Sequence, residues 1–293
     1  MTINDSAAKE HAFRLTENWK DFFRTRDEGL GTTYERFVLH AHFRRIKGRY
    51  GVDRVLEAPV FGMTGISGIN SLWWAGHGAE VTLADHSRER LTLVKKIWHE
   101  LSLDVHLVCV SSPCQSLPFE DAAFDMSWNF AALGPPVHVK ALLPELARVT
   151  RKAVFICVPN RSNLLGPFFN LLIERRPDFK TSPLSPRFIR ELMRKANWSL
   201  EESGFLDVPP WPDIGMPKEN LFNKIGLRTY VRALQKGVAR KNRLCILDYY
   251  TGKDRAMKRR IKRYAFLENG PAWLKRLWAH HHWQIFTPKV IAQ

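Results

Sequence analysis

The chain has 293 residues, of which 45% are hydrophobic and 25% charged, a composition that excludes disordered, collagen-like and coiled-coil proteins. Its net charge of +16 is unevenly distributed, because residues 1–150 carry a net −1 and residues 151–293 a net +17. The basic half favours an anionic partner, either RNA or a membrane surface, although a solvated helical surface would have the same composition.

Nothing in the sequence predicts export or membrane insertion. No apolar run reaches the roughly 20 residues that cross a bilayer, and the first 20 residues lack the apolar region of a secretory signal. The four cysteines form no C-x-x-C pair and are interpreted as reduced thiols. We therefore expect a cytoplasmic protein whose basic half could bring it to the membrane surface as a peripheral protein.

The first half alternates between short apolar runs and helical patterns. Aromatic residues at helical spacing predict two or three amphipathic helices over residues 10–50, broken near residues 29–31. Strands are then expected at 54–58, 80–85, 105–110, 124–129 and 153–158, and helices at 65–76, 87–100 and 138–150, with Ser87 as a helix cap. This alternation predicts a parallel sheet covered by helices on both faces.

After residue 159 the alternation is less regular. A helix is expected at 186–196 with Ser185 as its cap, a strand at 198–208 and a last strand at 282–287. Residues 218–279 are mostly helical in pattern and very basic, and Lys253–Arg263 (KDRAMKRRIKR) is predicted to be one helical stretch that could contact phosphate groups.

The ends of the first two strands suggest a nucleoside site. Glu57 ends the first strand, Gly62 and Gly65 follow in the loop before a helix, and Asp85 ends the second strand. Glycines allow a ligand to approach the backbone, and a helix N-terminus offers free N–H groups. A carboxylate after the second strand can accept hydrogen bonds from both ribose hydroxyls.

Four segments together carry a family resemblance: VLEAPVFGMTGISG, GAEVTLADHS, SLPFEDAAFDMSWNF and LPELARVTRKAVFICVPN. Through them, residues 54–160 resemble the class I S-adenosylmethionine-dependent methyltransferases, especially the broad small-molecule and quinone group. The resemblance implies S-adenosyl-L-methionine as cofactor and a doubly wound, Rossmann-like sheet of seven strands. The chain would then divide into an N-terminal helical cap (1–50), the cofactor-binding core (51–208), a basic helical insertion or lid (209–279) and the final strand (280–293).

The resemblance also implies roles for individual residues. The cofactor-binding residues expected from it are Glu57, Pro59, Gly62 and Gly65 for the methionine part, Asp85 with His86 for the ribose, Ser112 for the adenine, and Asn129 with Phe130 beside the transferred methyl.

The chain departs from the family pattern in three places. Ala58-Pro59-Val60-Phe61 replaces the first glycines of the usual E/D-x-G-x-G-x-G loop, and Ser111-Ser112-Pro113-Cys114 replaces the acid that usually meets the adenine amine. Arg151-Lys152 stands where a glycine pair usually precedes the fifth strand. A non-catalytic protein that keeps the fold and acts through partner contacts is therefore one alternative.

Methyl transfer from a sulfonium needs mainly in-line positioning and sometimes a base. His86 and His138 are the candidate bases. No metal site is expected, because His280–His282 alternate faces in a strand and no Cys or acid lies at ligand spacing. An apolar patch at residues 168–173 and the many tryptophans favour an apolar or amphipathic acceptor, lipid- or quinone-like, over the second alternative, an RNA-binding or RNA-modifying enzyme.

Overall fold

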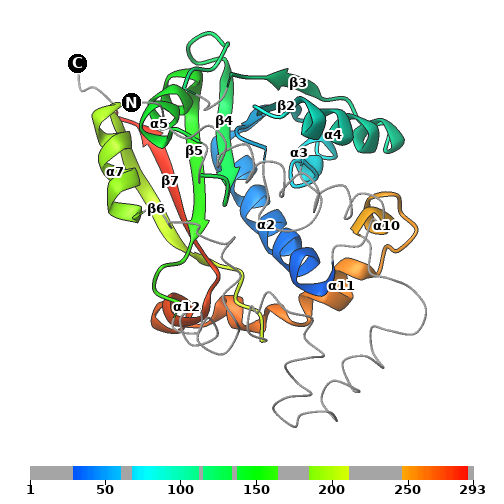
Figure 1. The fold of residues 1–293 in the computed structure, drawn as a ribbon. Coiled ribbons are helices and arrows are strands. Elements are labelled where there is room, and N and C mark those ends of the chain that lie inside the picture. Colours follow the sequence, from blue (N-terminus) through cyan, green and yellow to red (C-terminus); the bar gives the residue numbers. More distant parts are fainter. Residues whose placement is uncertain are drawn as a thin grey trace, which may run out of the picture.

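A single sheet of seven strands organises the computed structural model (Figure 1), which describes residues 29–60, 68–111, 115–133, 137–163, 185–210 and 246–289. The strands are β1 (Arg54–Glu57), β2 (Glu80–Asp85), β3 (His106–Cys109), β4 (Phe124–Phe130), β5 (Thr150–Pro159), β6 (Trp198–Leu206) and β7 (His281–Pro288). Their order is β3-β2-β1-β4-β5-β7-β6, and β7 runs antiparallel to both of its neighbours.

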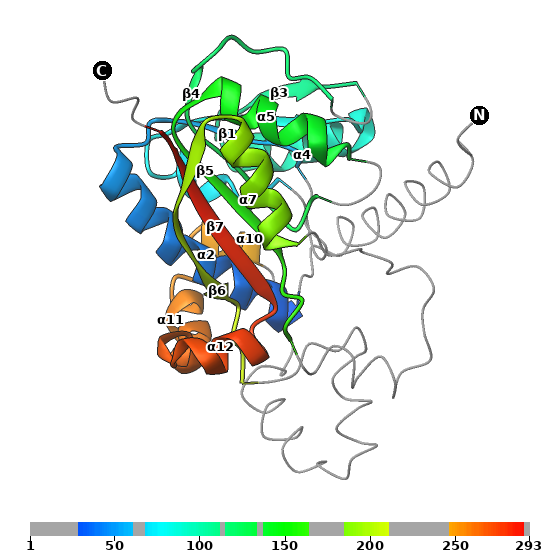
Figure 2. The ribbon, with the colours of Figure 1, turned by 90° about the vertical axis from the view of Figure 1, so that its left-hand side faces the viewer.

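Helices cover both faces of this sheet (Figure 2). The described helices are α2 (Gly29–Tyr50), α3 (Leu72–Ala75), α4 (Arg88–Glu100), α5 (Val139–Val149), α7 (Pro186–Lys195), α10 (Ile246–Tyr250), α11 (Met257–Lys262), the 3-10 helix η1 (Ala265–Asn269) and α12 (Ala272–Trp278). Strand residues alternate between two cores, one shared with α2, α3 and α4 and the other with α5 and α7. This is the two-sided cover that parallel strands require.

Helix α2 links the sheet to the C-terminal helices. In its middle, the Phe43 ring packs on Trp128 of β4, with ring centroids 4.8 Å apart. Its outer side meets α11, whose Met257 and Ile261 belong to the same core (Figure 1). Near its start, the Tyr34 hydroxyl donates to the carbonyl oxygen of Val208, just after β6. The start of α2 therefore lies beside the end of β6.

The structure confirms the seven-stranded, doubly wound fold and most predicted elements within one to three residues. Ser87 caps α4 as predicted, because its side chain accepts a hydrogen bond from the backbone N–H of Arg90. Two predictions were wrong in detail. Ser185 precedes α7, but its side chain makes no capping hydrogen bond. The helix expected over Lys253–Arg263 is only α11, since residues 251–256 form turns in which Gly252 takes a left-handed φ of 76°.

The predicted helix at 65–76 is seen only as α3, since residues 61–67 lie outside the described part. The division of the chain into cap, core, insertion and final strand stays a prediction. Within the described ranges, no helix combines the length and apolar character needed to span a bilayer.

Candidate functional site

Three polar side chains meet at the carboxyl ends of neighbouring strands. Glu57 is the last residue of β1 and pairs with β2 on one side and β4 on the other. Asp85 ends β2, and Asn129 lies near the end of β4. All three are at most 1% exposed. Ligands of doubly wound sheets bind at this edge, so the fold positions these groups where a ligand would be recognised.

Glu57 is a carboxylic acid held in an apolar setting. One carboxyl oxygen accepts a 2.5 Å hydrogen bond from the Ser71 hydroxyl, just before α3. Burial raises the pKa of Glu57 from 4.5 to about 8, while the Ser71 hydrogen bond and the positive charge of Arg36 oppose this rise and Asp85 adds to it. The carboxyl group is therefore largely protonated at neutral pH and would ionise when a cation binds beside it.

Asp85 is already engaged by its own helix. Both of its carboxylate oxygens accept hydrogen bonds from one guanidinium nitrogen of Arg90, at 2.8 and 2.7 Å, and one also accepts from the backbone N–H of Ser87 at 2.8 Å. His86 lies beside it, with 3.6 Å between its Nδ1 atom and the nearer carboxylate oxygen. Burial lowers the pKa of His86, against the pull of the Asp85 charge, so its ring favours the neutral form.

The side-chain amide of Asn129 lacks hydrogen-bond partners among the described residues. Its side-chain nitrogen and oxygen are both buried and make no hydrogen bond among the described residues. A buried, unpaired amide is costly, and such groups are usually satisfied in the functional state. Phe130 follows and is 1% exposed, with its ring centroid 4.5 Å from that of His281. The end of β4 therefore combines an unsatisfied amide with an apolar wall.

The other predicted residues fall in different places. Pro59 follows Glu57 in the loop, and the next backbone N–H, of Val60, donates to the carbonyl oxygen of Ala84 in β2. His138 is exposed before α5 and forms no side-chain capping bond. Gly62, Gly65 and Ser112 lie outside the described residues.

Two contacts at this site were not predicted from the sequence. Ser71 stands at the N-cap position of α3, yet its hydroxyl donates its hydrogen bond to Glu57 and does not cap the helix. Arg90 could have been suspected, because it lies five residues after Asp85 and just under one helical turn after the cap Ser87. Both act on the two carboxylates from short helices that follow the strands.

Comparisons with known proteins agree with this geometry. Residues 63–158 match the family model described as a methyltransferase domain, while no curated protein matches the sequence of the chain. A sarcosine dimethylglycine methyltransferase candidate from Galdieria sulphuraria is 11% identical, with a TM-score of 0.50 over 85% of this chain and 84% of that chain.

Two further solved structures are similar at a lower level. A geranyl diphosphate methyltransferase in complex with SAM is 13% identical, with a TM-score of 0.47 and 85% of each chain covered. The magnesium protoporphyrin IX methyltransferase of Synechocystis PCC 6803 with bound SAH is 14% identical, with a TM-score of 0.45 over 65% of this chain and 86% of that chain.

The strand order and the matched domain define a class I methyltransferase fold. The chain carries a class I S-adenosylmethionine-dependent methyltransferase domain, and S-adenosyl-L-methionine is the cofactor of that class. The described residues fit this cofactor. Glu57 and Asp85 supply buried carboxyl groups at adjacent strand ends, and Asn129 supplies an amide without a hydrogen-bond partner among the residues that the structure describes.

Proposed function

We propose that this protein transfers a methyl group from S-adenosyl-L-methionine to a small amphipathic acceptor, by direct in-line displacement. The observation that carries the proposal is the match of residues 63–158 to a methyltransferase domain, together with two buried carboxylates at the ends of β1 and β2. When bound, the cofactor supplies the methyl group on a sulfonium, so the protein has mainly to bind, orient and exclude water.

The residues at the sheet edge divide this work. Glu57 would hold the ammonium group of the cofactor, because a cation favours the ionised form of a buried acid. Asp85 would accept hydrogen bonds from the ribose hydroxyls, and His86 would border them. Asn129 would pair its free amide with a polar group of the bound molecules, and Phe130 would keep water from the reacting atoms.

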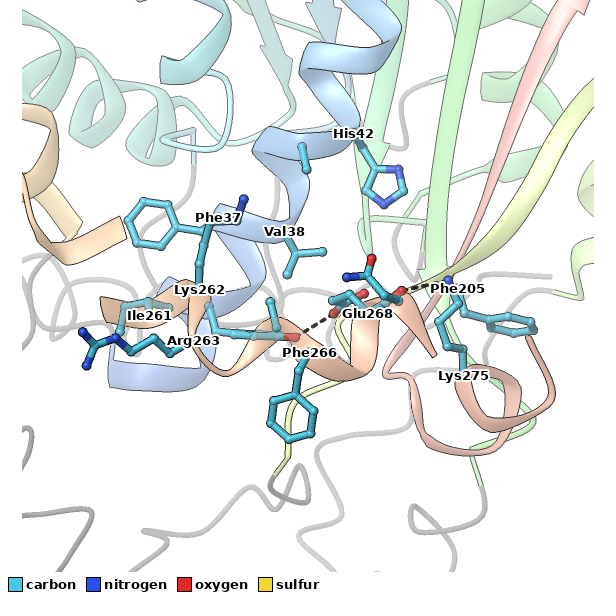
Figure 3. A pocket seen from close by; sticks show the side chains of 14 residues that line it. Phe37, Val38, His42, Phe205, Ile261, Lys262, Arg263, Phe266, Glu268 and Lys275 are labelled. Atoms are coloured by element: carbon cyan, nitrogen blue, oxygen red, sulfur yellow. Dashed lines mark hydrogen bonds between the residues drawn. The ribbon is translucent and has the colours of Figure 1, made fainter. Parts of the chain in front are cut away.

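A cavity beside the start of α2 supports an amphipathic acceptor (Figure 3). It has a volume of about 440 Å³ and lies between α2, α11, η1 and α12. Apolar side chains that include Phe37, Val38 and Phe266 line it, together with the basic Lys262 and Lys275 and with Glu268, whose pKa is raised by burial to about 7. Small-molecule sites usually combine an apolar lining with a few polar groups. An apolar body with an acidic head would match this lining.

The neighbouring surface supports an anionic acceptor. A shallower depression beside this cavity is lined by five basic side chains and one tyrosine: Tyr249, Arg255, Lys258, Arg259, Lys262 and Arg263. It shares Lys262 and Arg263 with the apolar cavity. An anionic head would therefore meet several cations at the mouth. The same surface is where we propose peripheral contact with an anionic membrane, because phospholipids present the same charge.

Calorimetric titration tests the cofactor step directly. We expect wild-type protein to bind S-adenosylmethionine and S-adenosylhomocysteine, and Asp85→Asn to bind both at least about tenfold more weakly through loss of a charge-assisted hydrogen bond. Asp121→Asn is the matched control, because Asp121 also pairs with an arginine, Arg148 at 2.7 Å, but is 78% exposed. Thermal denaturation of each variant verifies folding. Wild-type protein that binds neither compound would contradict the proposal.

The acceptor step follows with the radiolabelled methyl donor. We compare methyl transfer to three amphiphiles that share one apolar chain and carry a carboxylate, a phosphate or an uncharged head. We expect transfer only to the two anionic compounds. Equal transfer to the uncharged compound would contradict the proposed role of the basic residues, and transfer only to RNA would favour the nucleic-acid alternative.

A further inference from the structure

A second cluster of polar side chains lies at the same edge of the sheet, away from Glu57 and Asp85. It consists of Glu35 in α2, Asp207 just after β6 and His281, the first residue of β7. His281 pairs with Leu206 of β6, so the backbone brings it beside Asp207. Asp207 is 4% exposed and His281 6%, and the Glu35 side chain is 12% exposed.

The distances within this cluster suit a bound cation better than direct hydrogen bonds. The Nδ1 atom of His281 lies 3.6 Å from a carboxylate oxygen of Asp207 and 4.0 Å from one of Glu35. Both distances are too long for hydrogen bonds. Two ligands that each lie about 2.1 Å from one metal ion can be no more than about 4.2 Å apart, so both separations can be bridged by a single ion.

The imidazole of His281 provides an independent observation. Its Nδ1 atom is buried and has no hydrogen-bond partner within the described ranges, although two carboxylates face it. Buried ring nitrogens normally have a partner. A metal ion would bind this Nδ1 atom and both carboxylates at the same time.

Asp207 is also held in place as a ligand would be. Its carboxylate accepts a 2.7 Å hydrogen bond from the Nδ1 atom of His280, and its backbone has a left-handed φ of 64°. Metal-binding side chains are commonly oriented by such an outer hydrogen bond. A non-glycine residue in this conformation costs free energy and persists where its surroundings fix it.

We propose that Glu35, Asp207 and His281 bind one divalent transition-metal ion, Zn²⁺ or Mn²⁺. One imidazole nitrogen with two carboxylate oxygens suits these ions, whereas Mg²⁺ is bound through oxygen ligands only. Three protein ligands leave a coordination position open. The His281 ring also packs on Phe130 at the end of β4, so the proposed metal site adjoins the sheet edge that carries the proposed cofactor-binding residues.

The spacing of residues around His280–His282 predicts no metal site, because both acids of the cluster come from distant parts of the chain. The metal site does not depend on the proposed acceptor. Its failure would leave methyl transfer intact, and loss of cofactor binding would leave the metal site intact.

Metal titration of the full chain tests the site. Protein stripped with a chelator is titrated with Zn²⁺ by calorimetry and with Mn²⁺ by electron paramagnetic resonance, with Mg²⁺ as the comparison ion. We expect one Zn²⁺ or Mn²⁺ per chain, loss of that binding in His281→Ala and Asp207→Asn, and no comparable Mg²⁺ binding. Zn²⁺ should also raise the melting temperature of wild-type protein but not that of His281→Ala.

His282→Ala is the matched control. His282 is the next residue of β7, and its Nδ1 atom is also buried without a hydrogen-bond partner in the part of the chain that the structure describes. Its ring packs on Phe205 instead of facing the two carboxylates. This variant should bind the metal as wild-type protein does. Zn²⁺ binding that survives in His281→Ala, or that is absent from wild-type protein, would overturn the proposal. If His281→Ala fails to fold, Glu35→Gln carries the same test.

Discussion

Replacing Glu57 by Gln should make the stability of the protein less sensitive to alkaline pH. Glu57 is 1% exposed, and burial raises its pKa from 4.5 to about 8. Between these two values the folded protein keeps the proton, while the unfolded chain has lost it. The native state therefore binds more protons, and the free energy of unfolding falls as pH rises from about 4.5 to about 8.

The size of this effect follows from the shift in pKa. One pKa unit corresponds to about 1.4 kcal/mol, so wild-type protein should lose up to about 5 kcal/mol through this residue over that pH range. The Gln variant has the same shape, keeps an oxygen that can accept the Ser71 hydrogen bond and has no proton to lose. The difference in free energy of unfolding between Glu57→Gln and wild type should thus increase toward pH 8 in favour of the variant.

Urea denaturation at several pH values between 5 and 8.5 measures this difference. Glu191→Gln serves as the control, because the Glu191 side chain is 46% exposed and accepts hydrogen bonds from Arg194 that lower its pKa. It is therefore ionised across this pH range, and its difference from wild type should stay nearly constant. A Glu57→Gln difference that does not change with pH would refute the reasoning, since it would mean that the carboxyl group is already ionised in the folded protein.

The same residue links pH to cofactor binding. Binding of an ammonium group beside Glu57 should ionise the carboxyl and release a proton at pH 7. Calorimetry in buffers of different ionisation enthalpy would detect that proton, and Glu57→Gln should show none.

Two further changes test the packing that supports the site. Gly204→Ala should destabilise the protein by about 1 to 3 kcal/mol in denaturant melts, because the new Cβ would lie 2.8 Å from the indole of Trp283, and an unchanged midpoint would contradict this contact. Asp125→Asn should cost about 2 to 3 kcal/mol at pH 7 in the same assay, because the buried carboxylate accepts hydrogen bonds from Arg151 at 2.8 Å and forms an ion pair with Lys152 at 2.7 Å. Burial acts to raise the pKa of Asp125, but these partners hold it below its usual range. The loss of stability in Asp125→Asn should therefore diminish only below about pH 4, where the wild-type carboxylate begins to be protonated on unfolding. An equal loss of stability at pH 3 would argue against the ion pairs.

The fold was predictable because its signals are local. The apolar run Glu80–Asp85 and the cap Ser87 are contiguous in sequence, and both appear in the structure as predicted. The placement of Glu57 and Asp85 at one edge was predictable for the same reason, since each ends a strand and parallel strands end at one edge. Signals of this kind do not depend on which residues the fold later brings together.

The proposed metal cluster could not be predicted this way. Glu35, Asp207 and His281 come from a helix, a strand end and a strand start that are distant in sequence. Only the pairing of β6 with β7 and the position of α2 bring them together. No local spacing encodes that convergence. The shortened α11 is a smaller example, because residues 251–256 form turns that include the left-handed Gly252, and a run of basic residues does not indicate where those turns end.

The contact between Asp85 and Arg90 decides how the cofactor must enter. Asp85 is fully buried, and both of its oxygens are engaged by Arg90. A ribose needs the same oxygens, so binding must either add its hydroxyls to lone pairs that remain free or displace the guanidinium from the start of α4. Asp85 is thus both an ion-pair partner and a ligand-binding residue. Its replacement leaves Arg90 without this buried partner and should cost stability as well as affinity, which is why the cofactor titration of Asp85→Asn must be paired with thermal denaturation.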